Sequence, residues 1–151
     1  MTTIKHKTYI SNVLVIGSGG SGLRAAIEAK KSGVEVTIIG KRTKEDVHTV
    51  LAAGGINAAF GNVDPEDSWK QHFADTMIEG YGLSEPRMVE LMAKEAPELV
   101  TEIDEWGANL AKLENGKMDQ RFFGAHTHRR TCYSGDYTGR SILMAPVSYT
   151  H

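Results

Sequence analysis

Three glycines have the spacing that a phosphate-binding turn requires. Gly17, Gly19 and Gly22 form G-x-G-x-x-G between the apolar, β-branched run 12–16 and the helix-forming run 23–31. In a strand–turn–helix unit the first glycine allows a tight turn, the second lets the backbone approach a pyrophosphate, and the third lets helix and strand pack closely. The helix N-terminus adds N–H donors and partial positive charge. In this context the pattern predicts a dinucleotide-binding turn.

The elements around this turn predict a βαβ unit. Gly33 is placed to end the helix in the C′ position, and residues 34–39 form a second buried-type strand. A right-handed crossover then makes the two strands parallel neighbours. Where an acidic residue usually holds a ribose hydroxyl, the sequence has Gly40 and Lys41. The missing acid disfavours simple NAD binding, so a backbone carbonyl or a water would have to take its place.

Composition places the chain among ordinary globular domains. It has 151 residues, 40% hydrophobic and 24% charged, with a formal net charge of -2. A disordered tail and a collagen-like fibre are excluded, and the near-neutral charge argues against nucleic acid as a partner. Cys132 is the single cysteine and cannot form an internal disulfide. Because no apolar run approaches the roughly 18 residues of a membrane span, and the start lacks a signal-peptide core, we expect a soluble intracellular chain.

Two helices are predicted between residues 65 and 106. The first begins with Pro65 in the N1 position and turns an apolar stripe toward the core, formed by Trp69, Phe73 and Met77. The second covers 85–106 and should break or kink near Ala96, because Pro97 disfavours the α conformation in the residue before it. One side of this second helix carries the apolar residues Met88, Leu91, Met92, Leu99, Val100, Ile103 and Trp106.

The last third of the chain predicts a hairpin and a helix. The turn ENGK between two short runs predicts a β-hairpin with Asn115-Gly116 at its tip. A helix is expected to start near Thr138, and residues 145–151 (APVSYTH) are expected not to continue it. This ending indicates a truncation or an altered reading frame. The parallel sheet would then keep an open edge, which favours aggregation or marginal stability.

Two polar pairs near residue 128 are weaker candidates for a site. His126 and His128 have the spacing H-x-H, but without a third ligand nearby a metal site is disfavoured. Arg129 and Arg130 could bind a carboxylate or a phosphate, although adjacent arginines are more often solvated or held in structural ion pairs.

A second glycine-rich segment resembles a known family. His48-Thr49-Val50 followed by residues 52–56 (AAGGI) is similar to the HTVxAQGGI signature of succinate dehydrogenase and fumarate reductase flavoproteins, and the spacing from Lys41 also matches. The resemblance extends over nearly the whole chain, through Trp69, His72 and Asp75, Pro97-Glu98, residues 119–124 (DQRFFG), and residues 136–139 (DYTG).

This resemblance implies an α/β, Rossmann-like FAD-binding domain with added helices and a hairpin. The implied FAD-binding residues are Gly17, Ser18, Gly19, Gly20, Ser21, Gly22, Gly40, Lys41, Arg42, His48, Thr49, Ala52, Gly54 and Gly55. In the family the histidine at His48 carries covalently attached FAD, and an unmodified histidine beside the flavin remains the alternative. Phe123 would lie on the substrate side. The residues that act as proton shuttle and hold the substrate carboxylates lie beyond position 151, so no catalytic residue and no metal ligand is expected in this chain.

Departures from the family pattern leave alternatives open. Ala53 replaces a polar residue, Ala125 replaces a glycine, and residues 124–130 are closer to the corresponding stretch of L-aspartate oxidase. Aspartate oxidases generally have Ser at the position of His48 and Glu at that of Phe123, where the acid pairs with the substrate ammonium. We therefore favour interconversion of succinate and fumarate. L-aspartate oxidase and a non-catalytic FAD- or nucleotide-binding fragment are the alternatives.

The resemblance also implies a larger assembly. Residues 1–151 would be the N-terminal part of an FAD-dependent oxidoreductase domain, without the capping domain. An iron–sulfur subunit and a membrane anchor would be the partners, on the cytoplasmic, inner face of the membrane. The 151-residue chain alone is then expected to bind FAD weakly and to be inactive.

Overall fold

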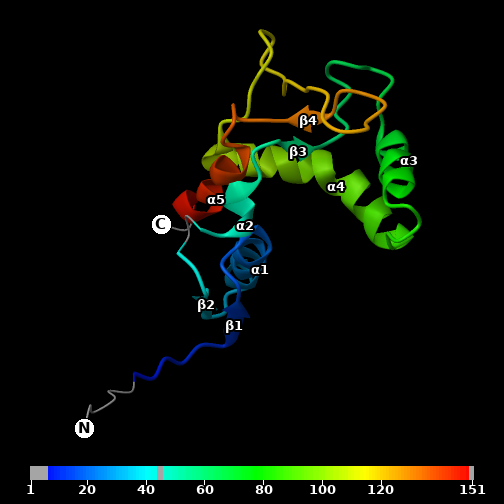
Figure 1. The fold of residues 1–151 in the computed structure, drawn as a ribbon. Coiled ribbons are helices and arrows are strands. Elements are labelled where there is room, and N and C mark those ends of the chain that lie inside the picture. Colours follow the sequence, from blue (N-terminus) through cyan, green and yellow to red (C-terminus); the bar gives the residue numbers. More distant parts are fainter. Residues whose placement is uncertain (1–6, 44–45, 150–151) are drawn as a thin grey trace. The chain divides into compact units, whose positions relative to one another are not determined.

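The computed structural model describes residues 7–43 and 46–149, and the chain divides into two compact units. Unit 1 is Met1–Val47 and unit 2 is His48–His151 (Figure 1). Residues 44 and 45 lie outside the described part.

Unit 1 contains the predicted βαβ arrangement. Strand β1 (Val13–Ile16), helix α1 (Gly20–Lys31) and strand β2 (Val36–Ile39) follow one another, and the two strands pair in parallel with Val13 opposite Val36. The α/β class with a parallel pair is therefore confirmed. Helix α1 begins inside the glycine turn, three residues earlier than the helix-forming run. Gly33 has φ +83° after the C-cap residue, as a C′ glycine should.

Unit 2 is built on one long helix. In Figure 1, α3 lies at one end of α4, while α2 and α5 lie toward its other end. A short antiparallel pair, β3 (Ile56–Asn57) and β4 (Thr131–Cys132), places Ile56 opposite Cys132. The helices are α2 (His48–Leu51), α3 (Trp69–Glu79), α4 (Pro86–Ile103), the π-helical turn η1 (Asp104–Ala108) and α5 (Thr138–Tyr149).

Helix α3 starts four residues later than predicted. Pro65 lies in a turn closed by the Asp67 N–H donating to the Asp64 carbonyl at 3.0 Å, and Ser68 is the N-cap, its hydroxyl accepting from the Gln71 N–H. A serine side chain can cap the orphan N–H groups of a first turn, whereas a proline only tolerates that position. The expected apolar stripe is half-buried, and the buried residues of α3 are the polar His72 and Asp75.

Helix α4 is continuous, so of the break or kink predicted near Ala96 the break was wrong. Pro97 lies inside the helix, and both turns beside it are held by packing, since Ala96 and Val100 belong to the core. The apolar side of the helix is exposed over much of its length. The buried residues of α4 are Val89, Ala93, Ala96 and Val100, whereas Met88, Leu91, Met92 and Leu99 are exposed. Small residues let the helix approach the core closely, and tertiary packing here outweighs the pattern of larger side chains.

The hairpin is short, and its tip is where the sequence placed it. Lys112 and Met118 form an antiparallel bridge, and the Leu113 N–H donates to the Lys117 carbonyl at 2.8 Å. Gly116 has φ +80°, a conformation that favours glycine.

Helix α5 begins at Thr138 as predicted and extends through Pro146 to Tyr149. Residues 145–149 continue this helix, so the expectation that they would not was wrong. Residues 150 and 151 lie outside the described part.

The core of unit 2 includes the lone thiol. Cys132 is fully buried, and burial raises its pKa to about 12, so it is a packed, unreactive thiol at neutral pH. The rest of the core cluster is Ala58, Ala96, Val100, Ala108, Leu110, Met118 and Ala145. Among the described helices, none is both long and apolar enough to cross a bilayer.

Candidate functional site

The glycine turn of unit 1 has the geometry that its spacing predicted. Gly17 has φ +124°, and its N–H donates to the carbonyl of Ile39 at 2.8 Å, which ties the turn to the end of β2. A Cβ on Gly22 would lie 1.9 Å from the Gly17 carbonyl oxygen and 3.5 Å from a Val15 methyl. A side chain at Gly22 would therefore push α1 away from the turn.

The end of β2 packs against the same turn. A Cβ on Gly40 would lie 2.2 Å from the hydroxyl oxygen of Ser18. The serine thus occupies the space that a side chain at position 40 would need, which gives a physical reason for the missing acid there. Lys41 and Arg42 follow and are exposed, so this edge of the turn carries positive charge.

The N-terminus of α1 suits an anion. Gly19 is the N-cap and provides no side-chain hydrogen bond, and the first turn of the helix contains no acidic residue. The partial positive charge of the helix end is therefore not neutralised by its own first turn. A glycine-lined turn of this shape fits the pyrophosphate of a dinucleotide.

In unit 2 the Gly54-Gly55 pair packs closely against residues from later in the chain. Gly55 has φ +134°, and a Cβ there would meet the Thr131 methyl at 2.3 Å and the Cys132 carbonyl oxygen at 2.6 Å. A Cβ on Gly54 would meet the Phe123 ring at 2.5 Å. The close backbone approach expected of this segment is thus present, and its neighbours are residues about 70 positions later in the chain.

Arg121 holds the glycine pair through the backbone. One of its terminal nitrogens donates to the Gly54 carbonyl at 3.0 Å, and its guanidinium carbon lies 4.2 Å from the centre of the Tyr133 ring. The Tyr133 hydroxyl donates to Asp119 at 2.6 Å, a contact that raises the pKa of the tyrosine. Phe123 itself is 55% exposed, so much of its ring remains open to a ligand.

Helix α2 is positioned by the start of α5. The Gly139 N–H donates to the Ala52 carbonyl at 2.7 Å, and a Cβ on Gly139 would lie 2.0 Å from the Thr49 carbonyl oxygen. His48 lies at the beginning of this one-turn helix and is exposed. Sequence reasoning assigned no role to Gly139, although this glycine ends the DYTG segment that carries part of the family resemblance.

A buried ion-pair cluster forms the polar centre of unit 2. Arg130 is fully buried, and its Nη2 donates to Asp67 at 2.8 Å and to Asp75 at 2.9 Å. Asp75 also accepts from the backbone N–H and the hydroxyl of Thr127, at 2.9 Å and 2.8 Å. The structural ion-pair interpretation of Arg130 is confirmed. Arg129 pairs with Asp64, its backbone N–H donating at 2.7 Å, and hydrogen bonds from Arg129 lower the pKa of Asp64 to about 2.

The two histidines beside this cluster are neutral at pH 7. Burial, reinforced by the charge of Arg130, lowers the pKa of His72 to about 4 and also lowers that of His126. The residues 7–43 and 46–149 contain no group of three or more His, Cys, Asp or Glu placed to hold a metal ion.

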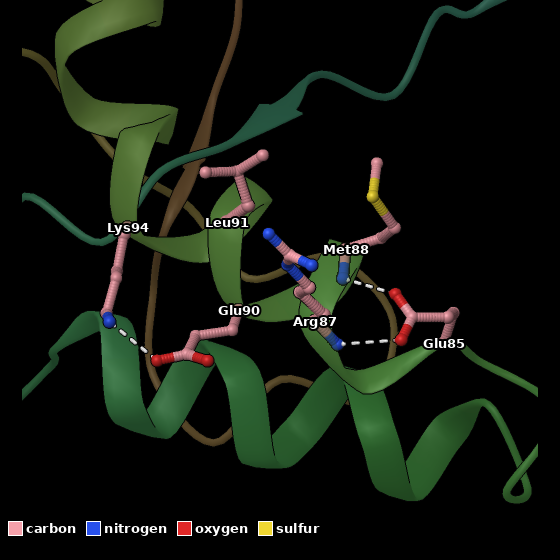
Figure 2. A pocket seen from close by; sticks show the side chains of 6 residues that line it. All are labelled: Glu85, Arg87, Met88, Glu90, Leu91 and Lys94. Atoms are coloured by element: carbon pink, nitrogen blue, oxygen red, sulfur yellow. Dashed lines mark hydrogen bonds and ion pairs between the residues drawn. The ribbon is translucent and has the colours of Figure 1, made fainter.

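A groove on the N-terminal half of α4 lies apart from the predicted site residues of unit 2. Figure 2 shows Leu91 near the ion pair of Glu90 and Lys94, whose charged atoms are 2.5 Å apart, and Met88 near Glu85. Glu85 caps the helix by accepting from the Met88 N–H at 2.7 Å. The lining of this groove includes none of the residues predicted to hold FAD.

Comparison with known families decides the nature of the glycine turn. The profile of the FAD binding domain family matches residues 12–150. The chain belongs to this family. FAD is therefore its cofactor, and the uncapped α1 N-terminus with its Cβ-free turn fits that assignment.

Similar proteins include subunits of fumarate reductase and succinate dehydrogenase. The chain is 44% identical over 143 residues to one subunit of the fumarate reductase (CoM/CoB) of Methanothermobacter marburgensis, covering 94% of this chain and 26% of the relative. It is 39% identical over 140 residues to the succinate dehydrogenase flavoprotein subunit of Rickettsia felis, covering 87% and 23%. The solved structure of Mycobacterium smegmatis Sdh1 in complex with UQ1 has a TM-score of 0.87 and 45% identity, covering 91% and 23%. The chain thus spans about a quarter of the length of the curated relatives it matches.

The predicted site residues fall into two groups, one in each unit. The turn 17–22 and Gly40 meet in unit 1, followed by Lys41 and Arg42. In unit 2 the Gly54-Gly55 pair meets Phe123 and Thr131, while Thr49 and Ala52 meet Gly139. Arg121 and Gly139 hold these segments, and both were found from the structure.

Acid should destabilise the chain through His72. The pKa of His72 is about 4 in the folded state and has its ordinary value of 6.5 in the unfolded state. As the pH falls, the unfolded state therefore binds a proton at His72 before the folded state does. The stability from neutral His72 is complete above pH 6.5 and should fall by about 3 kcal/mol as the pH approaches 4. Urea unfolding at several pH values measures this loss. His72→Gln should flatten the decline, and equal slopes in both proteins would contradict the assignment.

Gly22→Val should weaken FAD binding by at least about tenfold, since the new Cβ would displace α1 from the Gly17 carbonyl. Titration of the chain with FAD, followed by flavin fluorescence, measures the affinity. Ala25→Ser, on the exposed side of α1, is the matched control and should bind like the parent. Both tryptophans lie in unit 2, so unchanged tryptophan fluorescence would show that unit 2 is intact. Unaltered affinity of the valine variant would refute this placement of the pyrophosphate.

Proposed function

We propose that this chain is the FAD-binding part of the flavoprotein subunit of a succinate dehydrogenase or fumarate reductase. The observation that carries the proposal is the contact of Phe123 with Gly54, which joins the DQRFFG segment to the glycine pair after His48. These two segments carry the resemblance to that family. The similarity to a fumarate reductase subunit and a succinate dehydrogenase subunit supports the same interpretation.

Each group of residues has a distinct task in this proposal. The turn 17–22 and the α1 N-terminus hold the pyrophosphate through backbone N–H groups. Gly40, Lys41 and Arg42 lie along the adenosine side, while Thr49, Ala52, Gly54 and Gly55 line the isoalloxazine. Gly139 donates to the carbonyl of Ala52 and Arg121 to that of Gly54, which fixes the backbone that faces the cofactor.

FAD supplies the redox chemistry, accepting a hydride from succinate as a proton is lost and fumarate forms, or acting in the opposite direction. Phe123 offers an exposed apolar ring on the substrate side. It cannot pair with an ammonium group, which favours a dicarboxylate without an amine over aspartate. The proton-transferring and carboxylate-binding residues belong to segments outside this chain. The proposed partners are an iron–sulfur subunit and a membrane anchor, with the protein peripheral on the cytoplasmic, inner face of the membrane.

A chimeric subunit tests this function. Residues 12–150 would replace the matching segment of the Rickettsia felis succinate dehydrogenase flavoprotein subunit, and succinate oxidation would be measured with an artificial electron acceptor. We expect turnover within about tenfold of the parent subunit, because the segment supplies the flavin framework and the host supplies the groups that transfer protons. The 151-residue chain alone, saturated with FAD, should show none.

The controls separate binding from activity. The chimera carrying Gly22→Val should lose both FAD and turnover, which ties the activity to the transplanted turn. A chimera that binds FAD but oxidises aspartate and not succinate would favour L-aspartate oxidase. FAD binding without turnover of either substrate would favour a non-catalytic binding role.

His48 is proposed to form the covalent link to FAD through a ring nitrogen. It is exposed at the start of α2, so a ring nitrogen can reach a ligand without disturbing the core. In the active chimera, mass spectrometry should find the tryptic peptide containing His48 heavier by one flavin, and acid precipitation should leave the pellet yellow. His48→Ser should keep bound FAD but release it into the acid supernatant. An unmodified peptide from active protein would show that the flavin is held without a covalent bond.

A further inference from the structure

Four buried side-chain nitrogen atoms in unit 2 have no partner among the described residues, and one of them is Arg121 Nε beside the glycine pair. The other three are His72 Nδ1, His126 Nδ1 and Arg130 Nη1. Arg130 is 0% exposed and His72 is 2% exposed, so bulk water does not reach them. Buried polar groups in folded proteins are nearly always hydrogen-bonded, and a group of three in one region therefore needs an explanation.

Asp75 is the shared neighbour of the three side chains, because it contacts Arg130 and its charge acts on both histidines. One carboxylate oxygen of Asp75 accepts from Arg130 Nη2 at 2.9 Å and from the backbone N–H of Thr127, the neighbour of His126, also at 2.9 Å. His72 lies one helical turn before Asp75 on α3, and its ring centre is 6.5 Å from that of His126. The Arg130 charge also lowers the pKa of both histidines, so the guanidinium and the two imidazoles are near neighbours.

The hydrogen bonds of Asn57 determine which nitrogen of His126 carries its proton. The Asn57 side-chain oxygen accepts from the Thr131 hydroxyl at 2.7 Å, so its amide nitrogen faces His126 Nε2 at 3.2 Å. That Nε2 must accept. A neutral imidazole that accepts at Nε2 carries its proton at Nδ1, so the unpaired Nδ1 of His126 is a donor.

These donors restrict what can fill the region. His126 Nδ1 and Arg130 Nη1 both present N–H groups, so a metal cation does not fit. Asp67 and Asp75 already supply two carboxylates against the single guanidinium, so a further anion does not fit either. Water accepts two hydrogen bonds and donates two, so with His126 Nδ1 and Arg130 Nη1 donating to it, it fits this region when His72 Nδ1 is an acceptor.

We propose that unit 2 binds one internal water molecule, which accepts hydrogen bonds from His126 Nδ1 and Arg130 Nη1 and donates one to His72 Nδ1. The water completes the hydrogen bonding of the ion-pair cluster. It connects α3 to the loop before β4 and, through His126 and Asn57, to β3. In this arrangement His126 is the Nδ1–H tautomer and His72 the Nε2–H tautomer.

A crystal structure of the full chain at a resolution that shows ordered water tests the proposal. We expect one density peak at hydrogen-bond distance, about 2.7–3.2 Å, from all three nitrogens. The peak should lack the anomalous signal of a metal and the size of a polyatomic anion. An empty region, a direct protein partner for Arg130 Nη1, or an ion in place of water would overturn it.

Nitrogen NMR of the full chain labelled in histidine provides an independent measurement in solution. The proposal requires His126 to show the Nδ1–H pattern and His72 the Nε2–H pattern at pH 7. Asn57→Leu removes the donor that faces His126 Nε2 and should shift His126 toward the Nε2–H tautomer. Asn12→Ser, in unit 1, is the control and should leave both patterns unchanged. Finding His126 protonated at Nε2 in the parent chain would contradict the proposal.

Discussion

Unit 2 depends on one buried positive charge. Arg130 lies in the interior with Asp67 and Asp75 against its guanidinium, and these residues come from the loop before β4, the turn before α3 and α3 itself. Removing either partner from such a pair leaves an uncompensated buried charge, a loss of about 3–5 kcal/mol in general. The interaction therefore requires all three segments to be in place together. Because Asp75 also binds Thr127, the same charge positions the loop that leads back to the glycine pair.

Contacts that exclude a Cβ are the second constraint, and they shape the surfaces assigned to FAD. A side chain at Gly22, Gly40, Gly54, Gly55 or Gly139 would come within 2.6 Å of a neighbouring atom. At Gly22, Gly55 and Gly139 a backbone atom lies within that distance, and backbone cannot move aside cheaply. These glycines bring backbone segments together so that carbonyl and N–H groups, rather than side chains, form the face presented to a ligand. A flavin and a pyrophosphate are both suited to such a surface.

Local patterns in the sequence identified the strand–turn–helix of unit 1, the hairpin tip at Gly116 and the start of α5, because each depends on residues adjacent in the chain. Reasoning from periodicity failed on α4. Its larger apolar residues suggested the buried face, yet Ala93 and Ala96 are buried and Met88 is 60% exposed. Which face a helix buries depends on how closely its neighbours approach, and the sequence of the helix alone does not contain that information. Sequence reasoning also did not identify the partners of Arg130, because they lie more than 50 positions away in the chain.

Stability and ligand binding rest on different residues in this chain. The buried cluster around Arg130 holds unit 2 together and contributes no atom to the exposed face of the glycine pair. His48, by contrast, is exposed on a helix of one turn, and Phe123 is more than half exposed. An exposed, lightly packed histidine can form or lack a bond to a cofactor with little effect on the fold around it. Changes at His48 or Phe123 can therefore alter how a flavin is held, while changes at Arg130 or Asp75 act on the folded state itself. The resemblance to the flavoprotein family covers both groups, because it includes the exposed His48 and Phe123 as well as Asp75 of the buried cluster.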